Sequence, residues 1–210
     1  MPREVRITIF IVLVLLVAIF YFALFFYKPL RKIYYHHRPK EFFYHKIMKV
    51  VRNGDFYLLN NLELSLGDKD KAVIDHLMCG DKYLYVMMDF YCEGALSASP
   101  SDSRWIYYRK DGKKEEVSNP LIIAKNALMR LAMQTGINNR FFIGLVLIND
   151  DCFVNPFKNE DNDVLLVPLS KLQKVVDKYE ASEVNGFVPK ELYQVVHDLY
   201  ELNQKGKTNE

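Results

Sequence analysis

Hydrophobic residues are distributed unevenly along this chain, and the longest apolar run comes first. Residues 7–27 (ITIFIVLVLLVAIFYFALFFY) form a run of 21 residues without a charged side chain. A helix of that length extends about 31 Å, which matches the roughly 30 Å hydrocarbon core of a bilayer. A helix also satisfies its own backbone polar groups in lipid. The pattern therefore predicts a membrane-spanning helix over residues 7–27.

A cleaved secretory signal is the alternative interpretation of such a run. The apolar core of a signal is shorter, about 7–15 residues, and a small-x-small cleavage site follows it. Here the run ends in Leu24-Phe25-Phe26-Tyr27-Lys28-Pro29, which contains no such site. The run is also apolar on every side, which disfavours a buried core helix at a chain end. We therefore predict an uncleaved anchor.

Basic residues flank the predicted span unequally. Arg3 and Arg6 precede it, with Glu4 between them, and five Lys or Arg residues follow it within residues 28–40. Lys and Arg accumulate on the cytoplasmic side of a membrane. We therefore predict a plasma-membrane protein with residues 1–6 outside and the C-terminal part in the cytoplasm. Residues 28–40 would form a basic juxtamembrane linker against anionic lipid, so that residues 7–40 contact the membrane.

Shorter apolar segments with helical or strand spacing follow, as expected for one folded domain. We predict this domain over residues 41–203, with a flexible tail over residues 204–210. The order of its elements indicates an α/β (α+β) fold with a central mixed β-sheet flanked by helices. The predicted helices are 41–52, 120–134, 169–179 and 189–203, and the predicted strands are 56–59, 62–66, 72–79, 82–91, 105–109, 115–117, 141–148 and 164–167, with a polar acidic loop at 149–163.

Short sequence features predict further details of these strands, turns and helices. Residues 82–91 (KYLYVMMDFY) are so apolar that they predict a central strand buried on both faces. The close spacing of the first four strands predicts antiparallel neighbours. Asp111-Gly112 predicts a hairpin turn, and Ser118 or Asn119 can cap the helix that follows.

Charge and cysteine content narrow the choice of partner and compartment. Residues 1–40 hold seven of the 28 Lys and Arg and one of the 26 Asp and Glu, so residues 41–210 hold 21 basic and 25 acidic residues. A domain that binds nucleic acid electrostatically is usually basic, so a protein partner is favoured and nucleic acid is not. Cys79, Cys92 and Cys152 lie far apart without a CxxC spacing, which predicts free thiols in a reducing compartment.

A polar residue interrupts the apolar strand at 72–79, and further residues follow it in a recognisable order. An Asp in such a strand is costly unless it binds something. The ordered set is Ile74-Asp75-His76, Gly94, Trp105 and Asn119-Pro120. Over about residues 41–150 this set resembles the nuclease-related domain (NERD) family, a branch of the PD-(D/E)xK restriction-endonuclease-like superfamily. The resemblance implies that fold, and it implies a nuclease site in which Asp75 would hold Mg²⁺ or Mn²⁺.

The sequence departs from the family pattern at three of its four polar active-site positions. Met88 stands where the family has Glu, Phe90 where it has Lys, and Ile123 where its helix has Gln. A thioether is a poor ligand for a hard cation, and Phe carries no charge. These substitutions predict a degenerate metal site filled with core residues, in which Asp75 is a structural, hydrogen-bonded side chain.

A migrated active site is the alternative hypothesis. Strand alternation points Asp89 away from Asp75, but Glu93 or Glu63 could supply a second carboxylate. Lys125, on the helix after Pro120, could replace the missing Lys. Asp75 and Glu93 would then hold Mg²⁺ or Mn²⁺, and Asp75 and Lys125 would act in phosphodiester hydrolysis.

From the sequence we therefore expect a membrane-anchored, cytoplasm-facing nuclease-related domain without catalytic activity, acting as a binding or scaffolding module. This pseudoenzyme hypothesis requires no cofactor and favours a protein partner in the membrane or cytoplasm. The alternatives are an active metal-dependent nuclease and a purely structural partner of a membrane complex.

Overall fold

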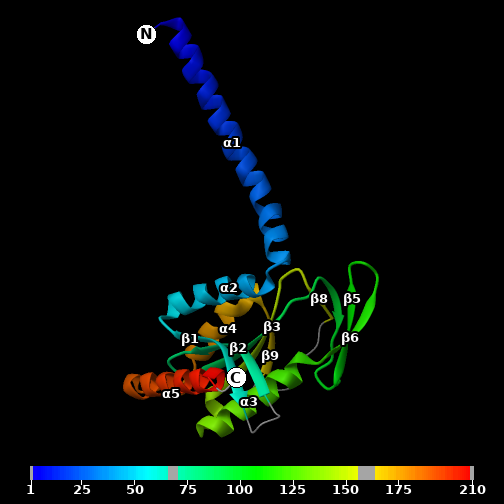
Figure 1. Cartoon of the computed structure of the whole chain (residues 1–210), viewed down its shortest axis with the longest axis vertical. Helices are drawn as coiled ribbons and strands as arrows, with labels where there is room; N and C mark the ends of the chain where they lie inside the picture. The colour runs from blue at the N-terminus through cyan, green and yellow to red at the C-terminus, as the bar shows by residue number, and fades with distance from the viewer. Residues whose placement is uncertain (1, 66–70, 156–163, 209–210) are drawn as a thin grey trace. The chain divides into compact units, whose positions relative to one another are not determined.

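The computed structural model describes residues 2–65, 71–155 and 164–208 (Figure 1). By its internal contacts the chain divides into two units, one ending at Phe42 and one beginning at Phe43. The two units are described in turn.

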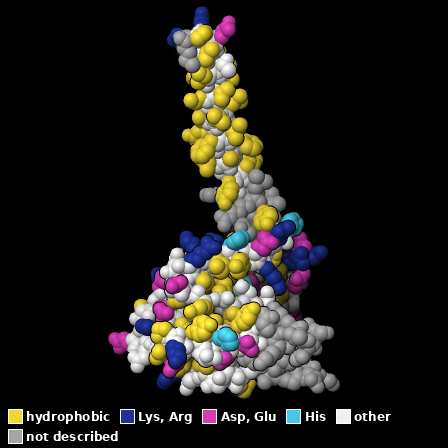
Figure 2. All heavy atoms as spheres, turned by 60° about the vertical axis from the view of Figure 1, so that its left-hand side comes forward, with side chains coloured by type: hydrophobic (Ala, Val, Ile, Leu, Met, Phe, Trp, Pro, Cys, Tyr) yellow, Lys and Arg dark blue, Asp and Glu magenta, His cyan; other side chains and the backbone are white. Residues whose placement is uncertain are grey.

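The first unit consists mainly of one long helix, α1 (Arg3–His36). Within its segment Arg3–Tyr27 a window of 18 residues has a mean hydropathy of 3.2, and none of that window is buried inside the structure. Figure 2 shows hydrophobic side chains covering the helix beyond the charged residues at its start. The helix is therefore long and apolar enough to cross a membrane, as the sequence predicts.

The segment predicted as a linker is also mostly helical. Helix α1 continues to His36 and helix α2 (Pro39–Gly54) begins three residues later. At this corner the Arg38 guanidinium donates to Glu41 Oε1 at 2.9 Å, and the Tyr34 hydroxyl donates to Glu41 Oε2 at 3.0 Å. Only His37 and Arg38 separate the two helices, so most of the segment predicted as a basic juxtamembrane linker is helical.

The second unit is built on a five-stranded sheet with the order β1-β2-β3-β7-β9. Strands β1, β2 and β3 are antiparallel neighbours, whereas β3, β7 and β9 run parallel, so the predicted mixed sheet is confirmed. As predicted from its apolar composition, β3 lies at the centre of the sheet. The strands are β1 (Tyr57–Ser65), β2 (Lys71–Cys79), β3 (Leu84–Phe90), β7 (Phe142–Ile148) and β9 (Val164–Pro168).

Helices cover both faces of this sheet (Figure 1). Helices α2 and α4 (Leu172–Glu180) lie over one face, and α3 (Pro120–Thr135) and α5 (Pro189–Thr208) lie over the other. Helix α2 buries the four residues whose helical spacing predicts it. These are Phe43, Ile47, Val50 and Val51. On the opposite face Leu128 and Leu131 of α3 and Leu199 of α5 pack with residues of β1, β2 and β3.

A second sheet of four strands has the order β6-β5-β4-β8. The predicted Asp111-Gly112 hairpin joins β5 (Arg104–Arg109) to β6 (Lys114–Ser118), with Gly112 at a φ of 83°. Strands β4 (Gly94–Ser97) and β8 (Phe153–Val154) were not predicted, because each is too short to show a periodic pattern.

A second apolar cluster, here called the junction cluster, joins this sheet to α3 and to the larger sheet. Its buried members are Cys92, Leu96, Ala98, Trp105, Leu121, Ala124, Val146 and Val164, and Met88 and Phe90 pack against it half-buried. The cluster therefore connects elements that lie far apart in the sequence.

Two further details differ from the prediction, and two predicted segments cannot be compared with the structure in full. The strands predicted at 56–59 and 62–66 form one strand, β1, in which Asn61 has a φ of 52°. Residue 66 and the part of the acidic loop over 156–163 lie outside the described residues. The tail predicted as flexible from residue 204 is helical to Thr208.

Candidate functional site

Asp75 lies in β2 at a point where strand pairing is interrupted on both sides. The β1–β2 ladder pairs Asn60 with His76 and Leu62 with Ile74 but leaves out the pair between them, and the β2–β3 ladder ends at His76 and Met87. Beyond that end Asp75 Oδ2 accepts a hydrogen bond of 3.0 Å from the backbone N–H of Asp89. The carboxylate thus replaces the strand acceptor that β2 no longer offers to β3.

His76 forms a buried polar network on the opposite side of β2. Its Nδ1 lies 2.6 Å from Asn60 Oδ1, and its Nε2 lies 3.1 Å from Asp89 Oδ2. The side chains of His76 and Asp89 are only 8% and 9% exposed. Both ring nitrogens are engaged within the protein, so the imidazole connects Asn60 of β1 to Asp89 of β3.

Met88 and Phe90 occupy the two positions at which the family pattern requires Glu and Lys. Both pack against the junction cluster. The Phe90 ring meets the buried Trp105 ring edge to face, with centroids 6.4 Å apart. The third departing position, Ile123, lies on α3 and is 42% exposed. Met88 and Phe90 therefore contribute apolar packing, whereas Ile123 does not belong to the core, contrary to the prediction from the sequence.

The residues that could form a migrated active site, Glu93, Glu63 and Lys125, do not share the surroundings of Asp75. The Tyr91 hydroxyl donates to Glu93 Oε1 at 2.6 Å, and Lys110 Nζ lies 3.7 Å from Glu93 Oε2. Burial and this hydrogen bond raise the pKa of Tyr91 above its ordinary value. Glu63 lies in β1, and Lys125 is half-buried on α3.

Asp75 is not part of a cluster of metal-ligating side chains among the described residues. Within residues 2–65, 71–155 and 164–208, no three His, Cys, Asp or Glu side chains come close enough together to hold a metal ion. Asp75, Glu63 and Glu93 therefore do not form a three-carboxylate site.

The remaining residues of the family pattern have structural roles. Asn119 is the N-cap of α3: its Oδ1 accepts from the Leu121 N–H at 2.9 Å, and its Nδ2 donates to Asp102 O at 2.7 Å. Trp105 Nε1 donates to Ser99 O at 2.7 Å. Both residues thus fix the segment before β5. A side chain at Gly94 would overlap the carbonyl oxygen of Tyr108 on the paired strand.

Comparison of the chain with protein-family models, with curated protein sequences and with solved structures finds no significant match. The resemblance to the nuclease-related domain therefore rests on the residues named above.

One arrangement in the structure was missed by the sequence analysis. Cys92 and Cys152 lie together beside the junction cluster, although 59 residues separate them in the sequence. The spacing of the cysteines in the sequence does not indicate that they lie together, because their proximity accompanies the pairing of β4 with β8.

The first prediction concerns the role of Asp75. We expect Asp75→Ala to lower the free energy of unfolding by about 1–3 kcal/mol, because the Asp89 N–H loses its acceptor. Asp75→Asn keeps a side-chain oxygen and should lose less. Denaturant titration of the full chain in detergent, with the exposed Asp81→Ala as control, measures both changes. An Asp75→Ala variant more stable than the wild type would instead indicate a functional carboxylate held at a cost in stability.

Proposed function

We propose that this protein is a single-pass, membrane-anchored pseudoenzyme whose C-terminal part is a nuclease-related domain of restriction-endonuclease-like fold. The domain faces the cytoplasm, lacks nuclease activity and serves as a binding or scaffolding module for a protein partner at the membrane. The observation that carries this proposal is the packing of Met88 and Phe90 into the junction cluster.

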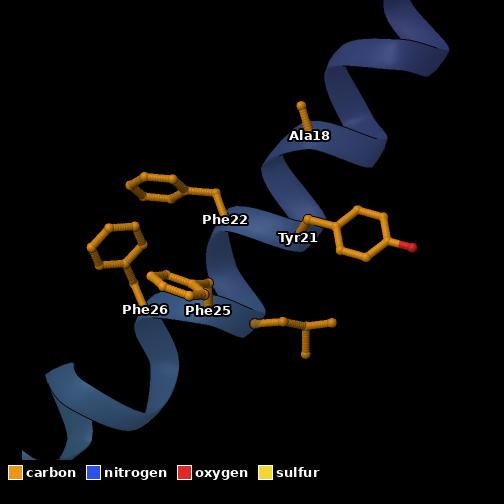
Figure 3. Close-up of a pocket in the computed structure, with 6 residues that line it drawn as sticks. Ala18, Tyr21, Phe22, Phe25 and Phe26 are labelled. Carbon is orange, nitrogen blue, oxygen red and sulfur yellow. The ribbon is translucent and has the colours of Figure 1, made fainter.

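The anchor is supported by the side chains that α1 presents. Phe22, Phe25 and Phe26 project from the outside of the helix (Figure 3), and the Phe22 and Phe26 rings lie 4.2 Å apart between centroids. The hollow between these rings is lined by residues of α1 alone, so it is a feature of one helix surface and not a ligand pocket. Lipid acyl chains would bury such an apolar surface, whereas its exposure to water would be unfavourable.

The orientation is supported by the charges at the two ends of the span. The five basic residues after it favour the cytoplasmic side more strongly than Arg3 and Arg6 before it. Each basic residue near an anionic leaflet contributes about 1 kcal/mol of attraction. The cytoplasmic leaflet is the anionic one, so residues 28–40 suit that surface.

The absence of catalysis is supported by the chemistry that phosphodiester hydrolysis requires. Metal-assisted hydrolysis needs carboxylates to fix the cation and charge near the attacking water. Asp75 retains one such carboxylate, but that group accepts the Asp89 N–H, and the positions at which the family has Glu and Lys hold Met88 and Phe90, which pack against the junction cluster. The acidic excess of residues 41–210 also makes a protein partner more suitable than nucleic acid.

The second prediction concerns activity. The purified full chain in detergent should not cleave single- or double-stranded DNA or RNA with Mg²⁺ or Mn²⁺, and calorimetry should detect no binding of either ion. Asp75→Ala and Lys125→Ala are assayed beside it. Cleavage that both substitutions abolish would contradict the proposal and establish a migrated active site, whereas cleavage that persists in both variants would come from a contaminant.

The third prediction concerns the anchor. The full chain should stay in the membrane pellet after alkaline extraction. The double substitution Leu15→Arg/Leu16→Arg should release it, because each Arg at the centre of a span costs about 2.5–3.5 kcal/mol on insertion scales. Leu15→Ala/Leu16→Ala is the matched control and should remain in the pellet.

The orientation is tested on intact cells with a tag at each end. We expect external protease to remove the N-terminal tag and to spare the C-terminal tag until the membrane is permeabilised. Removal of the C-terminal tag alone would show the opposite orientation.

A further inference from the structure

Asn149 brings Cys92 and Cys152 together at the end of the buried strand β7. The Cys92 N–H donates to Asn149 Oδ1 at 2.8 Å, and Asn149 Nδ2 donates back to Cys92 O at 2.7 Å. The Cys152 N–H donates to the backbone oxygen of the same residue, at 3.0 Å. Asn149 is only 4% exposed, so one buried side chain and its own backbone position both cysteines.

The two thiols affect each other's acidity. Hydrogen bonding with Cys152, with help from the Tyr107 hydroxyl, lowers the pKa of Cys92 although burial opposes the change. The same interaction and burial raise the pKa of Cys152. The pair therefore gives up its first proton more readily than an isolated buried thiol, and the thiolate is the reactive form.

Cys79 provides a contrast within the same chain. It is fully buried in β2, and burial raises the pKa of its thiol to about 12. Cys92 is buried as completely as Cys79, but its partner Cys152 is only half-buried, so a small oxidant would reach the pair at Cys152, in the turn before β8.

We propose that Cys92 and Cys152 form a reversible disulfide site that reacts with small peroxides. The contact between the two sulfur atoms and their common support by Asn149 carry this inference. It does not depend on the proposed function of the nuclease-related domain.

The oxidation proceeds in two balanced steps. The Cys92 thiolate attacks one oxygen of hydrogen peroxide, the O–O bond breaks, and hydroxide leaves and takes up the thiol proton, so that Cys92 becomes a sulfenic acid and one water forms. Cys152 Sγ then attacks Cys92 Sγ, the S–O bond breaks, and the departing hydroxide takes the Cys152 proton as a second water. Two thiols are oxidised to one disulfide, and one peroxide is reduced to two waters.

The bond would tie two short elements of the smaller sheet to each other. Cys92 precedes β4 and Cys152 precedes β8, and the two strands pair through Ala95 with Phe153 and Leu96 with Val154. Strand β8 is two residues long, so a covalent link beside it would hold β8 against β4 for as long as the disulfide persists. In a reducing compartment the pair would rest as two thiols and would close on exposure to peroxide.

The test uses the full chain in detergent micelles treated with hydrogen peroxide. The number of thiols that react after denaturation should fall from three to one. Trypsin places the three cysteines in separate peptides, 72–82, 83–104 and 141–158, so non-reducing mass spectrometry identifies the bond directly. We expect a link between 83–104 and 141–158 that dithiothreitol removes.

Variants define the specificity of the reaction. Cys79→Ser should form the same link as the wild type, whereas Cys92→Ser and Cys152→Ser should form no intramolecular link. The wild-type peptide map decides the question even if a variant fails to fold. Three remaining thiols after peroxide, a link that includes 72–82, or a link between two copies of the chain would overturn the proposal.

Discussion

The fold depends on how the central strand β3 leaves one neighbour while it stays paired with the other. Its ladder with β2 ends at His76 and Met87, but its parallel ladder with β7 continues to Phe90 and Ile148. A strand that separates in this way exposes backbone groups that need partners in a buried environment. Asp75 supplies the acceptor for Asp89, and His76 holds the Asp89 carboxylate, so the polar residues of β2 stabilise the separation.

This arrangement explains why apolar residues occupy the positions of an expected metal site. Once β3 has left β2, its last residues lie beside the second sheet and α3, where Met88 and Phe90 help to build the junction cluster. Asn119 and Trp105 fix the segment that leads into β5. At Met88 and Phe90 apolar packing replaces the charged side chains that the family pattern has. This replacement is the physical basis for proposing a binding module in place of an enzyme.

Elements with a strong local signal were predictable from the sequence. The spacing of Phe43, Ile47, Val50 and Val51 predicted α2, and the candidate caps Ser118 and Asn119 predicted the start of α3, where the structure has Asn119 as the cap. The site was predictable only in part. The departures from the family pattern at Met88, Phe90 and Ile123 can be read from the sequence, but the partner of Asp75 cannot, because every residue except proline has a backbone N–H. Strands β4 and β8 and the Cys92–Cys152 pair arise from contacts between distant segments, which local patterns do not encode.

Amide hydrogen exchange at Asp89 tests the central claim most directly, because that N–H reports whether the Asp75 carboxylate is committed to the fold. NMR measurements on the full chain in detergent would follow this amide with and without Mg²⁺. The account predicts slow exchange that Mg²⁺ leaves unchanged. Faster exchange of the Asp89 amide on addition of Mg²⁺ would contradict it, since it would show that the cation draws Asp75 away from β3.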